Sequence, residues 1–126
     1  MYVRRANSGP KSGNLYVDFN NIRYAVRAVL ILEQCDQKLQ PYFVTREDRA
    51  RYFAHVVPEE RIIRVPETER DADETAIMLA LEHRGYFLSQ FDFAKYNGKI
   101  IGLNQQWFDE HRVMFCFFDN DIHIFP

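Results

Sequence analysis

The sequence has few of the features that mark several common protein classes. It contains only two cysteines, Cys35 and Cys116, and their spacing indicates neither a disulfide framework nor a structural zinc site. No apolar stretch approaches the roughly 20 residues that a helix needs to cross a bilayer. We therefore expect a soluble protein without a membrane partner, in a reducing intracellular setting that is either cytoplasmic or nuclear.

Long charged runs and several catalytic motifs are also absent. The 16 basic and 18 acidic side chains are mixed along the chain and leave a formal net charge of -2, so a nucleic-acid surface must be a local patch. The four histidines lack a metal-binding spacing such as a paired i, i+4 motif, so we assign them no chemistry. No glycine-rich loop follows the first predicted strand, and no Gly-x-Ser-x-Gly motif surrounds Ser89. These absences disfavour a Rossmann nucleotide-binding domain and a serine hydrolase.

The length and the hydrophobic content of the chain are sufficient for one folded domain. The chain has 126 residues, of which 47% are hydrophobic, including 11 Phe and 7 Tyr. Residues 1–14 carry Arg4, Arg5 and Lys11 among small polar residues and lack the apolar core of a signal peptide. We predict a flexible N-terminal arm over residues 1–14 and a single domain over residues 15–126.

Strand-like and helix-like segments alternate along this domain. Alternating or β-branched apolar runs predict strands over 15–19, 42–44, 61–65, 86–89, 112–118 and 122–124, the last two joined by a turn at Asp119 and Asn120. Helical spacing predicts helices over 22–32, 46–55 and 71–84, with Gly85 ending the last one. This order predicts an α/β fold with a mostly parallel central sheet and helices on both faces.

Acidic residues follow several of the predicted strands. Ligands of such sheets bind at the carboxyl ends of the strands, so we expect Asp18, the region of Asp71 and the segment from Ser89 to Asp92 to converge. Carboxylate oxygens suit Mg²⁺ or Mn²⁺, which support phosphodiester cleavage. The structural alternative is helix capping, because Asp71 and Glu74 form a capping-box pattern and Asp92 can cap a short helix.

Four segments of the chain resemble, in order, those of Regnase-type NYN (PIN-like) endoribonucleases. The segments are Leu15 to Asn21, Asp71 to Glu74 with Ala80 to Gly85, Tyr86 to Asp92, and Arg112 to Phe118. The resemblance implies a PIN-like fold whose carboxylates hold a divalent metal, Mg²⁺ or Mn²⁺, that cuts single-stranded RNA.

The resemblance also implies roles for individual residues. Asp18 takes the place of the first-strand aspartate of the family, Asn21 that of its asparagine, and Asp73 that of the second aspartate of the helix pair. Ala72 and Phe91 stand where two further carboxylates are expected, and Asp92 lies next to the second of these positions. Ser89 is expected to orient the metal site or its water. The candidate catalytic residues are thus Asp18, Asp73, Asp92, Asn21 and Ser89, with Asp18, Asp73 and Asp92 as metal ligands.

Basic and aromatic residues supply candidates for RNA contacts. Arginines on the first two predicted helices form either a phosphate path or a solvated face, and the candidates are Arg23, Arg27, Arg46 and Arg49. Aromatic side chains either stack on bases or belong to the core, and the candidates are Tyr16, Tyr24, Tyr96 and Trp107.

We consider three functions for this sequence. The first is a metal-dependent endoribonuclease with a partly degenerate acidic site. The second is a catalytically inactive pseudo-nuclease that serves as an RNA-binding or protein-interaction module. The third, a phospho-acceptor receiver-like domain, is disfavoured because the predicted strand from Ile62 to Val65 ends without an acceptor aspartate. Single-stranded RNA is the expected partner, and protein partners or a homodimer stay open.

Overall fold

The computed structural model describes residues 12–18, 27–28, 31, 38–55, 57–66, 71–89 and 91–125. Most of the predicted N-terminal arm and most of the predicted first helix lie outside these ranges, although residues 27, 28 and 31 are helical. Cys35, Asn21 and Arg23 also lie outside the described residues.

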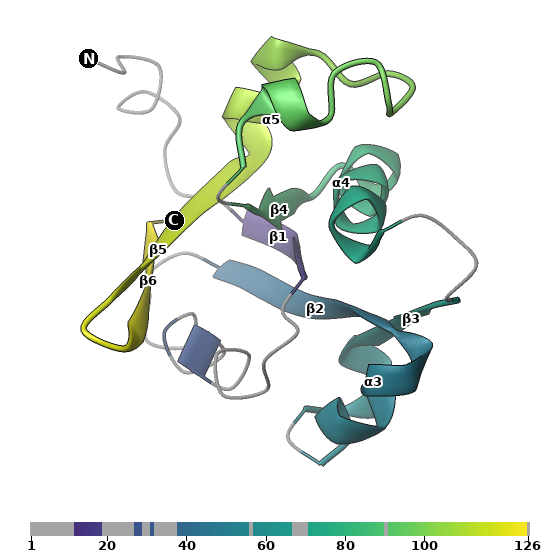
Figure 1. Ribbon diagram of the computed structural model, residues 1–126, viewed down its shortest axis with the longest axis vertical. Helices are drawn as coiled ribbons and strands as arrows, with labels where there is room; N and C mark the ends of the chain where they lie inside the picture. Colours follow the sequence, from purple (N-terminus) through teal and green to yellow (C-terminus); the bar gives the residue numbers. More distant parts are fainter. Residues whose placement is uncertain are drawn as a thin grey trace.

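One six-stranded sheet organises the described part of the chain (Figure 1). Its spatial order is β3-β2-β1-β4-β5-β6, in which the first five strands run parallel and β6 runs antiparallel to β5. The strands are β1 (Ser12–Val17), β2 (Lys38–Arg46), β3 (Ile62–Val65), β4 (Tyr86–Leu88), β5 (Arg112–Phe118) and β6 (Asp121–Phe125). The prediction of a mostly parallel α/β sheet is confirmed, and β1 begins three residues earlier than predicted, because Ser12 already pairs with Lys38.

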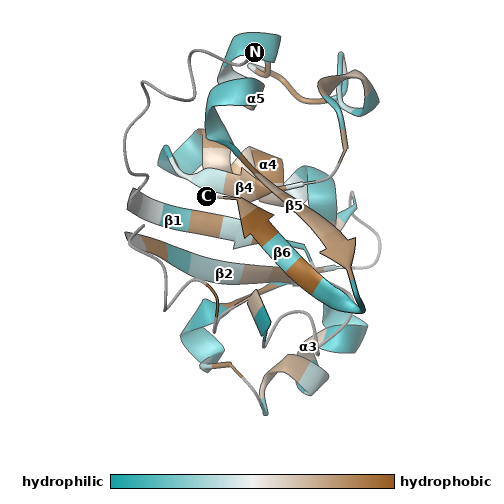
Figure 2. Cartoon of the chain, turned by 90° about the vertical axis from the view of Figure 1, so that its left-hand side faces the viewer, coloured by the Kyte–Doolittle hydropathy of each residue, from teal (hydrophilic) through white to brown (hydrophobic). Residues whose placement is uncertain are grey.

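Side chains alternate between the two faces of this sheet, so that each face has its own core. Leu15 and Val17 of β1 belong to one buried cluster, whereas Tyr16 belongs to the other. Helix α3 (Glu47–Phe53) packs on the first face through Ala50 and Phe53. The second face is covered by α4 (Ala72–His83) and α5 (Gln105–His111), and Figure 2 shows these helices on the side of the sheet opposite α3. The predicted placement of helices on both faces is confirmed.

The passage from α4 into β4 brings the chain very close to β1. The predicted glycine stop is only partly right, because Arg84 rather than Gly85 adopts the left-handed conformation, with a φ of 55°. A Cβ on Gly85 would lie 2.7 Å from the carbonyl oxygen of Asn14, well inside van der Waals contact. Glycine is therefore required here for the close approach of two backbones rather than for a positive φ.

The last two strands form the predicted hairpin. Asp119 and Asn120 both have positive φ, at 53° and 58°, and Phe118 pairs with Asp121 across them. Two consecutive left-handed residues match the twist of a two-residue hairpin, and aspartate and asparagine tolerate this conformation well.

None of the described helices has the length and apolar character that crossing a bilayer would need.

Candidate functional site

The carboxyl ends of β1 and β4 lie side by side, and we call the edge of the sheet between them the crevice. The strand order reverses between these two strands, since β2 and β3 lie on one side of β1 and β5 lies beyond β4. Val17 pairs with Leu88, so the residues that follow, Asp18 and Ser89, leave the sheet at the same edge. Such a switch point is where open α/β sheets bind their ligands.

Asp18 is the least satisfied polar group of this crevice. Its Oδ1 atom is buried, and none of the residues that the structure describes forms a hydrogen bond with it. Burial, together with the negative charges of Asp73 and Asp71, raises the pKa of Asp18 from 3.8 to about 6, although the positive charge of Lys95 acts in the opposite direction. These interactions place Asp18, Asp71 and Asp73 in one acidic region, as the order of elements predicted.

Asp73, in the first turn of α4, is by contrast well satisfied. Its Oδ2 atom accepts hydrogen bonds from Nζ of Lys95 at 2.6 Å and from the hydroxyl of Tyr96 at 3.0 Å. Its Oδ1 atom lies 2.9 Å from the backbone N–H of Glu74, which donates to it. Burial alone would raise the pKa of Asp73, but these hydrogen bonds and the Lys95 charge hold it below its usual value. Asp73 therefore remains ionised in a partly buried position.

Lys95 and Tyr96 complete the site, and the sequence did not predict either role. They lie at the end of a short 3-10 helix, η2 (Phe93–Lys95), which has no periodic pattern to reveal its orientation. The Tyr96 side chain is fully buried, and burial with the nearby charges of Asp73 and Asp18 raises the pKa of its phenol, whereas a hydrogen bond with Ser89 lowers it. Tyr96 thus connects the α4 carboxylate to the end of β4.

Hydrogen bonds from two side chains, Ser89 and Arg112, fix the backbone of the loop after β4. The hydroxyl oxygen of Ser89 accepts from the backbone N–H of Phe91 at 3.0 Å, and Arg112 donates to the Phe91 carbonyl at 3.0 Å. The predicted ligand Asp92 lies in this loop, but its side chain is 92% exposed and its carboxylate lies 3.7 Å from the Arg112 guanidinium. The structure thus brings Asp18, Asp73 and Ser89 toward one crevice and leaves the Asp92 carboxylate in solvent.

The capping alternative is not borne out by the hydrogen bonds. Asp71 occupies the N-cap position of α4, yet its side chain makes no capping hydrogen bond, and the exposed Thr75 hydroxyl donates to its backbone carbonyl instead. Asp92 precedes η2 in the same way, also without a side-chain cap. Both residues thus occupy N-cap positions, but neither carboxylate makes the capping hydrogen bond that this alternative implies. The capping pattern in the sequence predicted the position of each N-cap residue but not the rotamer of its side chain.

The candidate RNA-binding arginines are spread around this edge of the sheet. Arg46 ends β2 and lies 3.8 Å from Asp48, and Arg49 is exposed on α3. Arg27 donates through Nε to the carboxylate of Asp121 at 3.1 Å, at the start of β6. Because two of the three are paired with carboxylates at the surface, Arg49 is the candidate best able to meet a phosphate.

The aromatic candidates belong largely to the core. Tyr16 and Tyr96 are buried, so neither presents a ring face on which a base can stack. Trp107 stacks on Phe87 and on His111, with ring centroids 5.8 Å and 4.4 Å apart. Tyr24 lies outside the described residues. The core interpretation is therefore correct for Tyr16 and Tyr96.

The acidic region has the chemistry of a site for a hard cation. Among the described residues, no three or more His, Cys, Asp or Glu side chains are grouped so as to hold a metal ion. Mg²⁺, however, is commonly bound by one or two carboxylates with water and phosphate oxygens as the remaining ligands. The orphaned Oδ1 of Asp18 and the ionised Asp73 fit such a two-carboxylate site.

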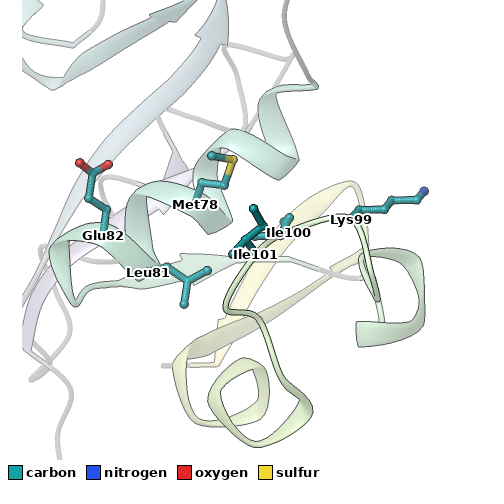
Figure 3. Close-up of a pocket in the computed structure, with 6 residues that line it drawn as sticks. All are labelled: Met78, Leu81, Glu82, Lys99, Ile100 and Ile101. Carbon is teal, nitrogen blue, oxygen red and sulfur yellow. The ribbon is translucent and has the colours of Figure 1, made fainter.

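A separate hollow lies farther along α4. It encloses about 390 Å³ between the second half of α4 and the loop that precedes α5. Met78 and Leu81 face Ile100 and Ile101 across it, and the ammonium of Lys99 points away (Figure 3). Its lining is mainly apolar and includes none of the residues of the acidic region, so we assign it no part in the chemistry.

No family model, curated protein or solved structure matches this chain. The resemblance to NYN ribonucleases is therefore a resemblance of sequence motifs alone.

Proposed function

We propose that this chain is a metal-dependent endoribonuclease of the NYN (PIN-like) type that cleaves single-stranded RNA. The observation that carries the proposal is the buried, unpartnered carboxylate oxygen of Asp18 at the switch point of the sheet. Burying a carboxylate without a partner is costly, and this cost is offset when a cation binds there. A site that retains such a group without satisfying it internally is a candidate for function.

In this proposal Asp18 and Asp73 hold one Mg²⁺ or Mn²⁺ ion, and Asn21 stays a candidate from the sequence motif. Bound between these carboxylates, the ion would activate water for attack and neutralise charge on the phosphodiester. Tyr96 holds the Asp73 carboxylate in place through its 3.0 Å hydrogen bond. Ser89, buried and bonded to the Phe91 N–H, fixes the loop that borders the crevice.

RNA would reach this crevice along the carboxyl edge of the sheet. Arg46 lies at that edge at the end of β2, and Arg49 follows in the first turns of α3. We propose both as phosphate contacts, with Arg27 and Arg23 as further candidates from the sequence. Because the formal net charge of the chain is -2 and few arginines are available, RNA binding should be weak, with a log-log salt slope of about -0.7 for each phosphate contacted.

A second function, that of an inactive pseudo-nuclease, is favoured by one specific contact. The Lys95 ammonium already neutralises Asp73, which is the second proposed ligand. The sequence also has Ala72 and Phe91 where the family resemblance implies carboxylates. A chain with this arrangement would keep the crevice for binding RNA or a protein without cutting RNA.

Cleavage of labelled single-stranded RNA in the presence of Mn²⁺ separates the two functions. We expect slow cleavage by the wild-type protein and none by the Asp18→Asn variant. Asp119→Asn is the matched control, since it removes an exposed carboxylate from the hairpin turn and asparagine suits the left-handed backbone there. Equal rates for all three proteins would refute the enzyme, and RNA binding without cleavage would establish the pseudo-nuclease.

A further inference from the structure

Lys95 is held at the acidic region by contacts on two sides. Its Nζ lies 2.6 Å from Oδ2 of Asp73 and 3.5 Å from the centroid of the Phe91 ring, and the Tyr96 ring centroid is 5.4 Å away. A carboxylate attracts an ammonium through a charge-assisted hydrogen bond, and an aromatic face attracts it through a cation–π interaction. The lysine is therefore positioned by specific partners and does not simply extend into solvent.

The positive charge of Lys95 interacts with both proposed metal ligands, Asp73 and Asp18. It forms an ion pair with Asp73, and it acts on Asp18, where the charges of Asp73 and Asp71 act against it. Among the described residues, Oδ1 of Asp18 nevertheless has no hydrogen-bond partner. Within this part of the chain, Lys95 is the one cation that acts on Asp18, so the region of Asp18, Asp71 and Asp73 keeps negative charge and an unbonded oxygen.

We propose that the Lys95 ammonium is a built-in cation that competes with the divalent metal for Asp73, so that metal binds fully only when Lys95 leaves this carboxylate. The inference rests on the proposed metal site and adds a regulatory residue to it. Lys95 can leave Asp73 because its side chain is 39% exposed, so that its ammonium can turn into solvent.

Competition has a direct consequence for affinity. In the wild-type protein the metal must break a short charge-assisted hydrogen bond before it can use Asp73. In Lys95→Met, which keeps the apolar stem and removes the charge, no such bond has to be broken. Mn²⁺ should therefore bind about tenfold more tightly to Lys95→Met than to the wild-type protein.

Mn²⁺ binding can be measured by titration with the electron paramagnetic resonance signal of the free ion, on wild type, Lys95→Met and Lys99→Met. Lys99→Met removes an exposed ammonium four residues away, beside the apolar hollow, and should bind Mn²⁺ as wild type does. Phe91→Leu removes the aromatic face that helps to hold the ammonium beside Asp73 and should strengthen Mn²⁺ binding, by less than Lys95→Met does. This variant also provides a test if Lys95→Met fails to fold without metal.

The outcomes distinguish this inference from the proposed function. Equal or weaker Mn²⁺ binding by Lys95→Met, with clear binding by the wild type, would overturn the competition and leave the metal site standing. Absence of Mn²⁺ binding in both proteins would overturn the metal site and the competition together. Tighter binding by Lys95→Met and by Lys99→Met alike would show a general effect of net charge and would also refute a specific role for Lys95.

Discussion

Replacing Asp18 by asparagine should stabilise the metal-free protein at neutral pH, although it removes the residue on which the proposed activity depends. Burial raises the pKa of Asp18 from 3.8 to about 6, so the folded state binds a proton more readily than the unfolded chain does. The difference corresponds to about 3 kcal/mol, at 1.36 kcal/mol for each pH unit. This is the free energy by which ionising Asp18 weakens the fold at pH 7.

The pH dependence has a definite sign. Well below the unfolded-state pKa of 3.8 the carboxyl is protonated in both states, and the stability associated with its raised pKa is fully present. This stability is lost as pH rises from that value through about 6, because the folded protein must then hold a charged Asp18. Asparagine does not titrate, so the stability of Asp18→Asn relative to wild type should increase by about 2.5 kcal/mol between pH 4 and pH 7.

Urea unfolding of both proteins in the presence of a chelator, at several pH values from 4 to 7, measures this difference. At pH 7 the net gain should be about 2 kcal/mol, because the asparagine amide is itself left partly unsatisfied. Asp119→Asn serves as the control, since it replaces a carboxylate that lies exposed in the hairpin turn. A difference between Asp18→Asn and wild type that is the same at pH 4 and pH 7 would refute the reasoning, because the carboxylate would then not be desolvated.

Three further substitutions test other parts of the structure. Gly85→Ala should destabilise the fold by roughly 1–3 kcal/mol in urea unfolding, because the new methyl group would meet the Asn14 carbonyl at 2.7 Å. An unchanged midpoint would mean that β1 and β4 can separate without cost. Asp92→Asn should leave the Mn²⁺ dissociation constant unchanged within about twofold, since its side chain is 92% exposed beside Arg112. A tenfold loss would instead make Asp92 a ligand. Arg49→Ala should lower the salt dependence of RNA binding by about 0.7 in the log-log slope, measured by fluorescence anisotropy, and an identical slope would place the phosphate path elsewhere.

Much of the fold was predictable because local signals agreed with the global arrangement. Short β-rich segments ended at polar residues, so the carboxyl ends of β1 and β4, and with them Asp18 and Ser89, were identified from sequence. The hairpin turn at Asp119 and Asn120 was also identified, because few residues accept two consecutive left-handed conformations. These features depend on residues close together in the chain.

The features that were missed depend on contacts between distant segments. Lys95 lies on a three-residue 3-10 helix with no hydrophobic period, and only the packing of that helix against α4 brings its ammonium to Asp73. Gly85 was assigned to the helix end, whereas its role comes from the Asn14 backbone some 70 residues earlier. Helix α5 was not predicted, although Asn104 caps it by accepting from the Trp107 N–H at 2.8 Å.

The parallel pairing of β1 with β4 also has a consequence for folding kinetics. The two strands are separated by roughly 70 residues, so closing this loop loses much chain entropy, and pairing over such a distance is slow. Asp18 becomes desolvated only once this pairing and the docking of α4 are complete. Its charge should therefore affect the native state more than the folding transition state, and Asp18→Asn should slow unfolding while leaving the refolding rate nearly unchanged. The residue proposed to bind metal would then set how long the metal-free protein stays folded.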